Sequence, residues 1–305
     1  MFDVHKSALD DSFDLAPPAG GYTLPTSYLS CSQIEMYLRC PRQYEFRYVK
    51  DMRRPPGVAM AFGTSAHKSV EITHHHIVDH GVPASDEQML TTFVDTFKFT
   101  SLDIPEETWT EENVTPGALQ DVGVRLMRLY NQKHASKVRP QVNDKQERGI
   151  EKRFETRICD VPIVGVIDLI DANADTTLLS AQERAICQTH NQPILDVMHT
   201  AVVDFKTKSK SFSKGDVDNS LQLTLYSYVE NIPTVRFDQF LRLKTPTFRQ
   251  IHSFRKHQDY QWLQQIVVGA AKAINAGIFP PCDPANWACS PKWCGYWDMC
   301  RGRKI

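Results

Sequence analysis

The sequence lacks the features that would place it in a membrane or on a secretory route. Its uninterrupted apolar stretches are only a few residues long, as at 266–268, which excludes the roughly 20-residue span of a transmembrane helix. The opening residues, MFDVHKSALDD, contain acids and no apolar run, so they do not form a secretory signal. We therefore expect no membrane contact and a reducing intracellular compartment, such as the cytoplasm of a bacterial or phage-infected cell.

A strong charge of one sign is also absent. The 35 Lys and Arg residues nearly balance the 36 Asp and Glu residues, which gives a formal net charge of −1. The chain as a whole therefore carries no electrostatic signature of nucleic-acid binding, and such a role must rest on local basic sets. These sets are Arg39, Arg42, Arg47, Arg53 and Arg54; Lys206, Lys208, Lys210 and Lys214; and Arg301, Arg303 and Lys304. A solvated surface explains them as well as phosphate binding does.

Periodicity and turn signals predict an α/β domain with a mixed β-sheet core flanked by helices. Apolar residues spaced three or four apart indicate helices at about 64–80, 118–134, 221–230 and 257–276. Short apolar or alternating runs indicate strands at 150–158, 162–170, 201–205, 235–243 and 248–255. A turn at Cys159-Asp160 joins the first two strands. No internal repeat is visible.

Composition divides the chain into a tail and one domain of three parts. Residues 1–25 are acidic and then Pro/Gly-rich, so we expect little structure there. The domain, 26–305, has a helical part at 26–148, a core at 149–256, and a C-terminal helix with a cysteine-rich end at 257–305. In the helical part, Ser32-Gln33-Ile34-Glu35 has the form of a capping box, and Pro41 ends one helix and opens the next. The stretches at about 81–117 and 172–200 have no clear period.

Two aspartates at strand ends predict a divalent-metal site. Asp168 closes the run Gly165-Val166-Ile167-Asp168, and Asp204 opens Asp204-Phe205-Lys206-Thr207. Residues two apart on a strand face the same side, so Asp204 and Lys206 face together while Phe205 enters the core. Two carboxylates from adjacent strands suit Mg²⁺, which can activate water, and the lysine adds positive charge for a phosphate. Taken alone, however, D-x-K is a common triplet, and an aspartate at a strand end commonly caps the strand.

Further polar residues in the same order add weight to this interpretation. Gln222 and Tyr226 lie four apart on one face of a predicted helix. Upstream, His67 follows Gly63 near the start of another helix, and an imidazole can complete a metal shell or contact a phosphate.

The set H, G-x-x-D, D-x-K-T and Q-x-x-x-Y resembles the RecB-like branch of the PD-(D/E)XK nucleases. The CRISPR-associated RecB-like exonucleases and many phage exonucleases belong to that branch. Residues 30–44 are similar to the family's N-terminal segment, and the resemblance spans about 28–305 apart from 80–148 and 172–200. Each motif is weak by itself, but five in order, together with the cysteines, are specific. The resemblance implies a restriction-endonuclease-like fold.

The resemblance also implies roles for individual residues. His67, Asp168 and Asp204 would be ligands of Mg²⁺ or Mn²⁺, assisted by the carbonyl of Phe205. Lys206 would be the catalytic lysine. Gln222 and Tyr226 would support the active site and contact DNA.

Eight cysteines in a reducing compartment point to a metal site rather than to disulfides. Four are scattered (Cys31, Cys159, Cys187 and Cys282), and the other four are Cys40 and the tail set Cys289, Cys294 and Cys300. Four thiolates suit an iron–sulfur cluster or a structural Zn²⁺, and spacing does not choose between them. In relatives, one early and three late cysteines hold a [4Fe–4S] cluster, so the resemblance favours that group, in a structural role. The x4 spacing after Cys289 is wider than the x2 of many relatives, and Cys282 is the main rival ligand.

Two further clusters are expected to have no catalytic role. His74, His75, His76 and His80 are interpreted as a solvated helix face, because three consecutive helical residues point in three directions. Trp287, Trp293 and Trp297 are expected to shield the cysteine site, although aromatic side chains can also stack on bases.

The function implied is a metal-dependent DNA exonuclease in recombination, repair or end processing. DNA, as single strands or duplex ends, would be its substrate. No helicase motif is present in the sequence, so a helicase or recombination partner would be a separate chain. The alternatives are an inactive DNA-binding or scaffold protein of the same fold, and an endonuclease within a larger complex.

Overall fold

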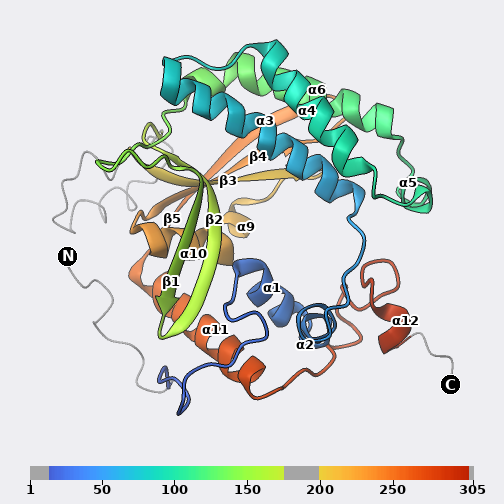
Figure 1. Ribbon diagram of the computed structural model, residues 1–305, viewed down its shortest axis with the longest axis vertical. Coiled ribbons are helices and arrows are strands. Elements are labelled where there is room, and N and C mark those ends of the chain that lie inside the picture. The colour runs from blue at the N-terminus through green and yellow to red at the C-terminus, as the bar shows by residue number, and fades with distance from the viewer. Residues whose placement is uncertain (1–13, 175–198, 302–305) are drawn as a thin grey trace. The chain divides into compact units, whose positions relative to one another are not determined.

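The computed structural model describes residues 14–174 and 199–301 (Figure 1). The chain forms two compact units. One, here called the cysteine unit, comprises Met1–Arg54, Phe154–Gly165 and Lys256–Ile305; the other, the sheet unit, comprises Pro55–Arg153 and Val166–Arg255. Among the described helices, none has both the length and the hydropathy needed to cross a bilayer.

A mixed five-stranded sheet in the order β1-β2-β3-β4-β5 is the framework of the fold. β2 and β3 are antiparallel, β3 and β4 are parallel, and β4 and β5 are antiparallel. This arrangement confirms the predicted α/β class. The strands are β1 (Ile150–Ile158), β2 (Val161–Asp171), β3 (Ala201–Lys208), β4 (Thr234–Leu241) and β5 (Thr247–Phe254).

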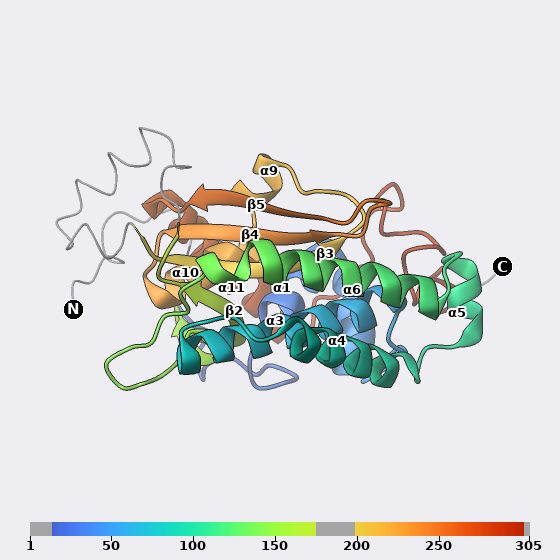
Figure 2. The same cartoon turned by 90° about the horizontal axis from the view of Figure 1, so that it is seen from above.

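Helices cover both faces of the sheet in the sheet unit. Phe205 of β3 contacts the rings of His74 on α3 (Val58–His80) and Tyr130 on α6 (Pro116–Lys133). The next residue, Lys206, bonds to Gln222 on α10 (Leu221–Glu230). Because neighbouring residues of a strand point to opposite faces, α3 and α6 lie on one face and α10 on the other. Figures 1 and 2 show α4 (Asp86–Ser101) beside α3 and α6.

The sequence prediction missed part of this helical layer. The unassigned stretch after residue 80 contains α4 and the short α5 (Glu106–Glu111), and α3 begins at Val58 rather than near residue 64. α4 buries Met89, Phe93 and Phe97 against α3 and α6. A short helix, α9 (Lys214–Asp218), packs beside β5. The predicted insertion at 172–200 lies mostly in 175–198, outside the described residues.

The cysteine unit brings early and late parts of the chain together. It contains α1 (Cys31–Arg39), α2 (Pro41–Tyr44), a π-helical turn (Glu45–Val49), α11 (His257–Asn275) and α12 (Trp297–Cys300). Tyr37 of α1 donates a hydrogen bond to the carbonyl of Ile278 at 2.9 Å, and Tyr44 stacks on Phe279. Pro41 opens α2 as expected. The cap of α1 is Ser30, whose hydroxyl accepts from the Gln33 N–H, so the capping box predicted at Ser32 is wrong by two residues.

Candidate functional site

Asp168 and Asp204 lie on neighbouring strands, as the sequence predicted. In the antiparallel register of β2 and β3, Leu169 lies opposite Val203, and the two aspartates are the next residue along each strand. The Asp168 Oδ2 accepts a hydrogen bond from the Phe205 N–H at 2.7 Å. Only 8% of Asp168 and 1% of Asp204 is exposed, so both carboxylates are withdrawn from solvent.

His67 on α3 points its ring toward these acids. Its Nε2 lies 3.0 Å from the carbonyl oxygen of Phe205. A carbonyl can only accept, so Nε2 carries the proton and donates. Nδ1 then faces the carboxylates, 3.7 Å from Asp168 Oδ1 and 3.7 Å from Glu151 Oε1. The Phe205 carbonyl, expected to assist in metal binding, thus also orients the imidazole.

Glu151 is a member of the site that the sequence prediction missed. It lies in β1 with a φ of +44°, a left-handed conformation that is rare for a residue other than glycine. Cys159 and Asp160 both have positive φ, as a two-residue hairpin turn requires. Counting outward from that turn places Glu151 opposite Asp168, and the hydrogen bond from the Ile170 N–H to the Gly149 carbonyl fits the same register. The turn predicted at Cys159-Asp160 fixes the hairpin register, and counting along that register from the sequence would have identified Glu151.

The acids and the imidazole perturb one another. Burial lowers the pKa of His67, but contact with Glu151 and the charges of Asp168 and Asp204 outweigh it and raise this pKa to about 9. Burial, followed by the charge of Asp204, raises the pKa of Asp168 to about 7, against the opposing effects of His67 and the Phe205 N–H. The site therefore concentrates negative charge where little water can screen it, which favours binding of a cation.

One ligand atom from each of His67, Glu151 and Asp168 lies within 4.8 Å of the other two. In an octahedral shell with bonds of about 2.0–2.1 Å, neighbouring ligands are about 3 Å apart and opposite ones about 4 Å. The three side chains are thus close to metal-binding spacing, and carboxylate oxygens with one imidazole suit Mg²⁺ or Mn²⁺. Asp204 is not part of this trio.

Lys206 joins Asp204 to the polar residues of α10. Its Nζ is 2.7 Å from Asp204 Oδ2 and 2.7 Å from the Gln222 Oε1, to which it donates. The Gln222 Nε2 in turn donates to the Tyr226 hydroxyl at 2.8 Å. Asp204, Lys206, Gln222 and Tyr226 therefore form one chain of polar contacts.

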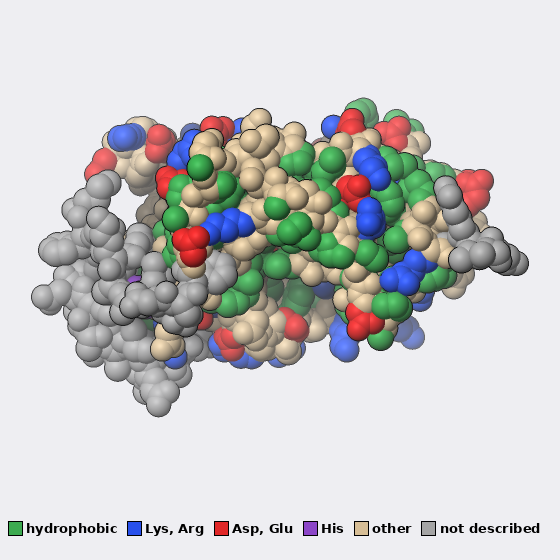
Figure 3. Space-filling view, turned by 90° about the horizontal axis from the view of Figure 1, so that it is seen from below, with side chains coloured by type: hydrophobic (Ala, Val, Ile, Leu, Met, Phe, Trp, Pro, Cys, Tyr) green, Lys and Arg blue, Asp and Glu red, His purple; other side chains and the backbone are tan. Residues whose placement is uncertain are grey.

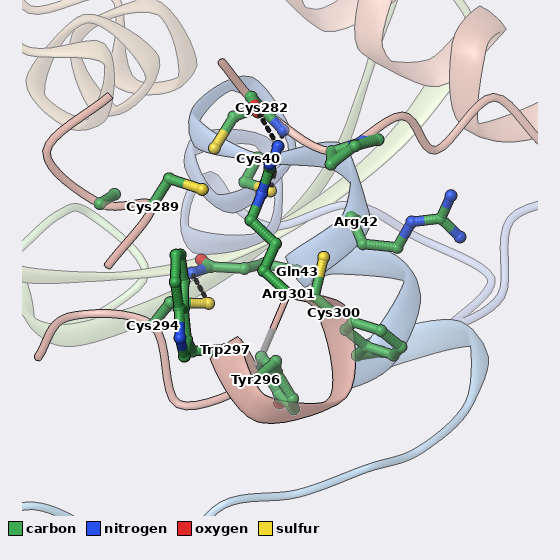
Figure 4. Close-up of a pocket in the computed structure, with 13 residues that line it drawn as sticks. Cys40, Arg42, Gln43, Cys282, Cys289, Cys294, Tyr296, Trp297, Cys300 and Arg301 are labelled. Carbon is green, nitrogen blue, oxygen red and sulfur yellow. Dashed lines mark hydrogen bonds between the residues drawn. The ribbon is translucent and has the colours of Figure 1, made fainter. Parts of the chain in front are cut away.

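A second candidate site lies within the cysteine unit (Figure 4). One pocket is lined by all four predicted ligands and by a fifth cysteine: Cys40, Cys289, Cys294, Cys300 and Cys282. The Gln43 Nε2 donates to Cys294 Sγ at 3.1 Å, and the Cys282 N–H donates to Cys40 Sγ at 3.4 Å. Burial and thiol contacts with Cys40 and Cys289 raise the pKa of the Cys282 thiol to about 12.

The sulfur spacing bears on which group the pocket suits. Zn–S bonds of about 2.3 Å place the sulfurs of a tetrahedral zinc site about 3.8 Å apart. Within residues 14–174 and 199–301, no three cysteine sulfurs lie within 4.8 Å of one another. Two closer thiol pairs are present, because Cys282 contacts both Cys40 and Cys289. Cys187, one of the scattered cysteines, lies outside the described residues.

The structure corrects two expectations about the discounted clusters. His74 is fully buried, not solvated, and its Nε2 lies 2.7 Å from the Tyr130 hydroxyl. Trp297 lines the cysteine pocket, but Trp287 is 66% and Trp293 is 59% exposed, so these two do not shield it.

The local basic sets are partly neutralised. Arg42 and Lys50 both pair with Glu45, Arg53 pairs with Asp51, and Lys214 pairs with Asp218. In Figure 3, Lys and Arg side chains are interspersed with acidic and hydrophobic ones rather than gathered into one patch. Arg303 and Lys304 lie outside the described residues.

Comparison with known proteins gives a match at the level of family and of fold. The family model described as PD-(D/E)XK nuclease superfamily matches residues 28–179 and 194–301. A crystal structure described as "Putative exonuclease" from Eubacterium rectale is similar, with a TM-score of 0.52 and 11% identity over 92% of this chain and 89% of that chain. At this identity the likeness is one of fold. No curated protein matches the chain.

Proposed function

We propose, from the premise that this chain belongs to the PD-(D/E)XK nuclease superfamily, that it is a DNA exonuclease dependent on Mg²⁺ or Mn²⁺. The superfamily hydrolyses phosphodiester bonds with divalent metal ions. The observation that carries the proposal is the convergence of His67, Glu151 and Asp168 beside the Asp204–Lys206 pair. We take residues 26–305 as the nuclease domain, and place its activity in recombination, repair or end processing.

In this proposal His67, Asp168 and Asp204 hold the metal, and Glu151 joins them as a fourth side chain. When bound, a divalent ion supplies an activated water and neutralises charge that develops on the phosphodiester. The buried carboxylates need such a cation, because Asp168 and Asp204 repel each other with little solvent between them.

Lys206 supplies a positive charge that the protein holds in place. Its ammonium group is fixed between Asp204 and Gln222, so little reorganisation is needed when charge builds up on a phosphate oxygen. Gln222 and Tyr226 act on Lys206 through the hydrogen-bonded chain and present polar groups for the DNA backbone.

We also propose that the cysteine pocket holds a [4Fe–4S] cluster in a structural role. Cys40, Cys289, Cys294 and Cys300 are its proposed ligands because they line one pocket, and the resemblance to iron–sulfur relatives favours the cluster over a single Zn²⁺. We expect a brown protein after anaerobic purification whose colour is lost in Cys294→Ser. Stoichiometric zinc without iron would refute this part of the proposal.

Exonuclease action requires a DNA end, which gives a direct test. The anaerobically purified chain is incubated with Mg²⁺ or Mn²⁺ and with end-labelled linear DNA, single-stranded and duplex, beside covalently closed circles of the same sequences. We expect mononucleotides or short products from the linear DNA and intact circles. Cleaved circles would instead support the endonuclease alternative, and no cleavage of any substrate would support the inactive scaffold.

Two pairs of variants assign the activity to this site. Asp204→Ala and Lys206→Ala are each expected to lower the rate by at least about 100-fold, because each removes charge from the reacting centre. Asp95→Ala and Lys98→Ala make the same changes at exposed positions of α4 and should retain wild-type rates. Circular dichroism checks that all four variants fold. Full activity in either site variant would refute the assignment.

A further inference from the structure

The cysteine pocket holds one thiol more than a four-ligand site requires. Cys282 lines the same pocket as the four proposed ligands, and Figure 4 shows its side chain on the side of Cys40 and Cys289. The inference below rests on the proposed thiolate-bound group, for which this pocket supplies the four predicted ligands and one further thiol.

The main chain at Cys282 is held in position from two sides. Its N–H donates to the Cys40 sulfur at 3.4 Å, and its carbonyl accepts from the Arg301 Nη2 at 3.2 Å. With the backbone fixed, the Cys282 thiol contacts both the Cys40 and the Cys289 sulfurs. A small rotation about its side-chain bonds would therefore bring this sulfur to a position now taken by a neighbour.

Cys289 is the neighbour that Cys282 can replace. Cys40 is buried, and its sulfur accepts a hydrogen bond from the Cys282 N–H. If the Cys282 sulfur replaced that of Cys40, this hydrogen bond, which positions Cys282, would be lost. Cys289, by contrast, lies in the segment 278–296, which contains turns and no helix or strand. Such a segment can adjust to a changed ligand without disrupting regular structure.

We propose that Cys282 is a reserve metal ligand, whose sulfur takes the place of Cys289 in the thiolate set when Cys289 is lost. The exchange is a substitution at one metal atom without oxidation or reduction. In a chain without Cys289, the Cys282 thiol would give its proton to solvent, and its thiolate would complete the four-thiolate set with Cys40, Cys294 and Cys300.

The test measures bound iron and acid-labile sulfide per chain in anaerobically purified variants. Cys282→Ser and Cys289→Ser are each expected to keep most of the wild-type iron, whereas the double variant loses at least about tenfold. Cys40→Ser and Cys294→Ser should lose iron as single variants. Cys159→Ser, outside the pocket, is the control. An iron-free Cys289→Ser protein that is still folded, or a double variant that retains its iron, would overturn the proposal.

Alkylation mapping provides a second readout that does not depend on yield. Folded protein is treated with iodoacetamide, and each cysteine is scored by mass spectrometry. With long incubation at pH 9, which offsets the raised pKa of this thiol, Cys282 should be alkylated in the wild-type chain and protected in Cys289→Ser; equal alkylation in both would overturn the inference. Zinc in place of iron in the wild-type chain would refute the proposed cluster but not the reserve ligand. The same variants would then test the replacement of Cys289 by Cys282 through their content of bound zinc. A wild-type chain with neither metal would overturn both.

Discussion

At the scale of single residues, Glu151 combines an unfavourable backbone with a useful side chain. A φ of +44° within a strand costs a non-glycine residue on the order of 1 kcal/mol. In this conformation the Glu151 carboxylate lies 3.7 Å from the His67 Nδ1, and Glu151 is opposite Asp168 on the neighbouring strand. Backbone strain beside converging polar groups is typical of positions kept for chemistry rather than for stability.

We predict that Glu151→Gln weakens metal binding while leaving the fold intact. The substitution keeps the side-chain shape but removes one negative charge from the site, so the affinity for Mn²⁺ should fall by roughly 10- to 100-fold. Isothermal titration calorimetry measures this affinity directly. Glu155→Gln makes the same change at an exposed position of β1 and should bind Mn²⁺ like the wild type. Unchanged affinity in Glu151→Gln would exclude Glu151 from the metal shell.

His74 should make stability depend on pH. Burial, with smaller effects from Arg236 and His75, lowers its pKa from 6.5 to about 3. Between these two pH values, His74 binds a proton in the unfolded chain but not in the folded chain. The free energy of unfolding therefore falls by about 1.4 kcal/mol for each pH unit below about 6.5.

Comparison with His74→Gln isolates this effect. Between pH 7 and pH 5 we expect the unfolding free energy of the wild type to fall by about 2 kcal/mol more than that of the variant. Urea unfolding at both pH values provides the measurement. Parallel losses in the two proteins would show that His74 does not titrate on unfolding.

The polar residues of the site were predictable where sequence spacing fixes their geometry. Asp204 and Lys206 share a strand face, and Gln222 and Tyr226 share a helix face, whatever the rest of the fold. Glu151 was missed because its relation to Asp168 appears only when the hairpin register is counted from its turn. The burial of His74 depends on Tyr130, far away in sequence, which no local pattern reveals.

At the scale of elements, α4 and α6 meet at a glycine. A Cβ on Gly123 of α6 would lie 1.9 Å from the Cζ of Phe93, whose ring is itself packed against Phe62 and Phe97. Only a residue without a side chain lets the two helices approach this closely. The glycine's lower helix propensity is the cost of that approach.

We predict that Gly123→Ala destabilises the protein by about 1–3 kcal/mol, because overpacking outweighs the gain in helix propensity. Gly117→Ala lies in the same helix with nothing within 4 Å of its Cβ, so it should stabilise by up to about 1 kcal/mol. Denaturant midpoints compare the two variants. If both variants changed stability equally, helix propensity alone would determine the effect, and Phe93 would be able to move away from the added methyl group.

Helices and strands with a clear apolar period in the sequence were predicted, and those without one were missed. α10 begins and ends as predicted, and β1 does too, because apolar periodicity and flanking turn residues agree there. α4 was missed although Ser85 and Gln88 form a capping box, since its buried residues are only Met89, Phe93 and Phe97 among many polar ones. Its place in the fold comes from the Phe62–Phe93 contact, which joins separate helices.

At the scale of the whole molecule, the proposed cluster closes a very long loop. Cys40 and Cys289 are about 250 residues apart in sequence yet line one pocket in the cysteine unit. A cross-link between such distant segments stabilises by limiting the freedom of the unfolded chain. The sequence predicted this pairing through resemblance alone, because no local pattern links Cys40 to the tail.

We predict that loss of the cluster loosens the cysteine unit and leaves the sheet unit protected. In Cys294→Ser, amide hydrogen exchange should rise in α1, α2 and α12, while β3 and β4 exchange as in the wild type. Mass spectrometry of peptides from both units measures this. Equal loss of protection in β3 and β4 would indicate that the chain unfolds as one cooperative block.

A surplus sulfur also changes which mutations the gene can tolerate. With five thiols in a pocket for four ligands, a codon change at Cys289 would leave a functional protein in a single step, provided Cys282 can bind. The ligand position could then move along the segment 278–296 over generations without a cluster-free intermediate. Descendants of one ancestor could thereby acquire different cysteine spacings in their tails while keeping the same metal group.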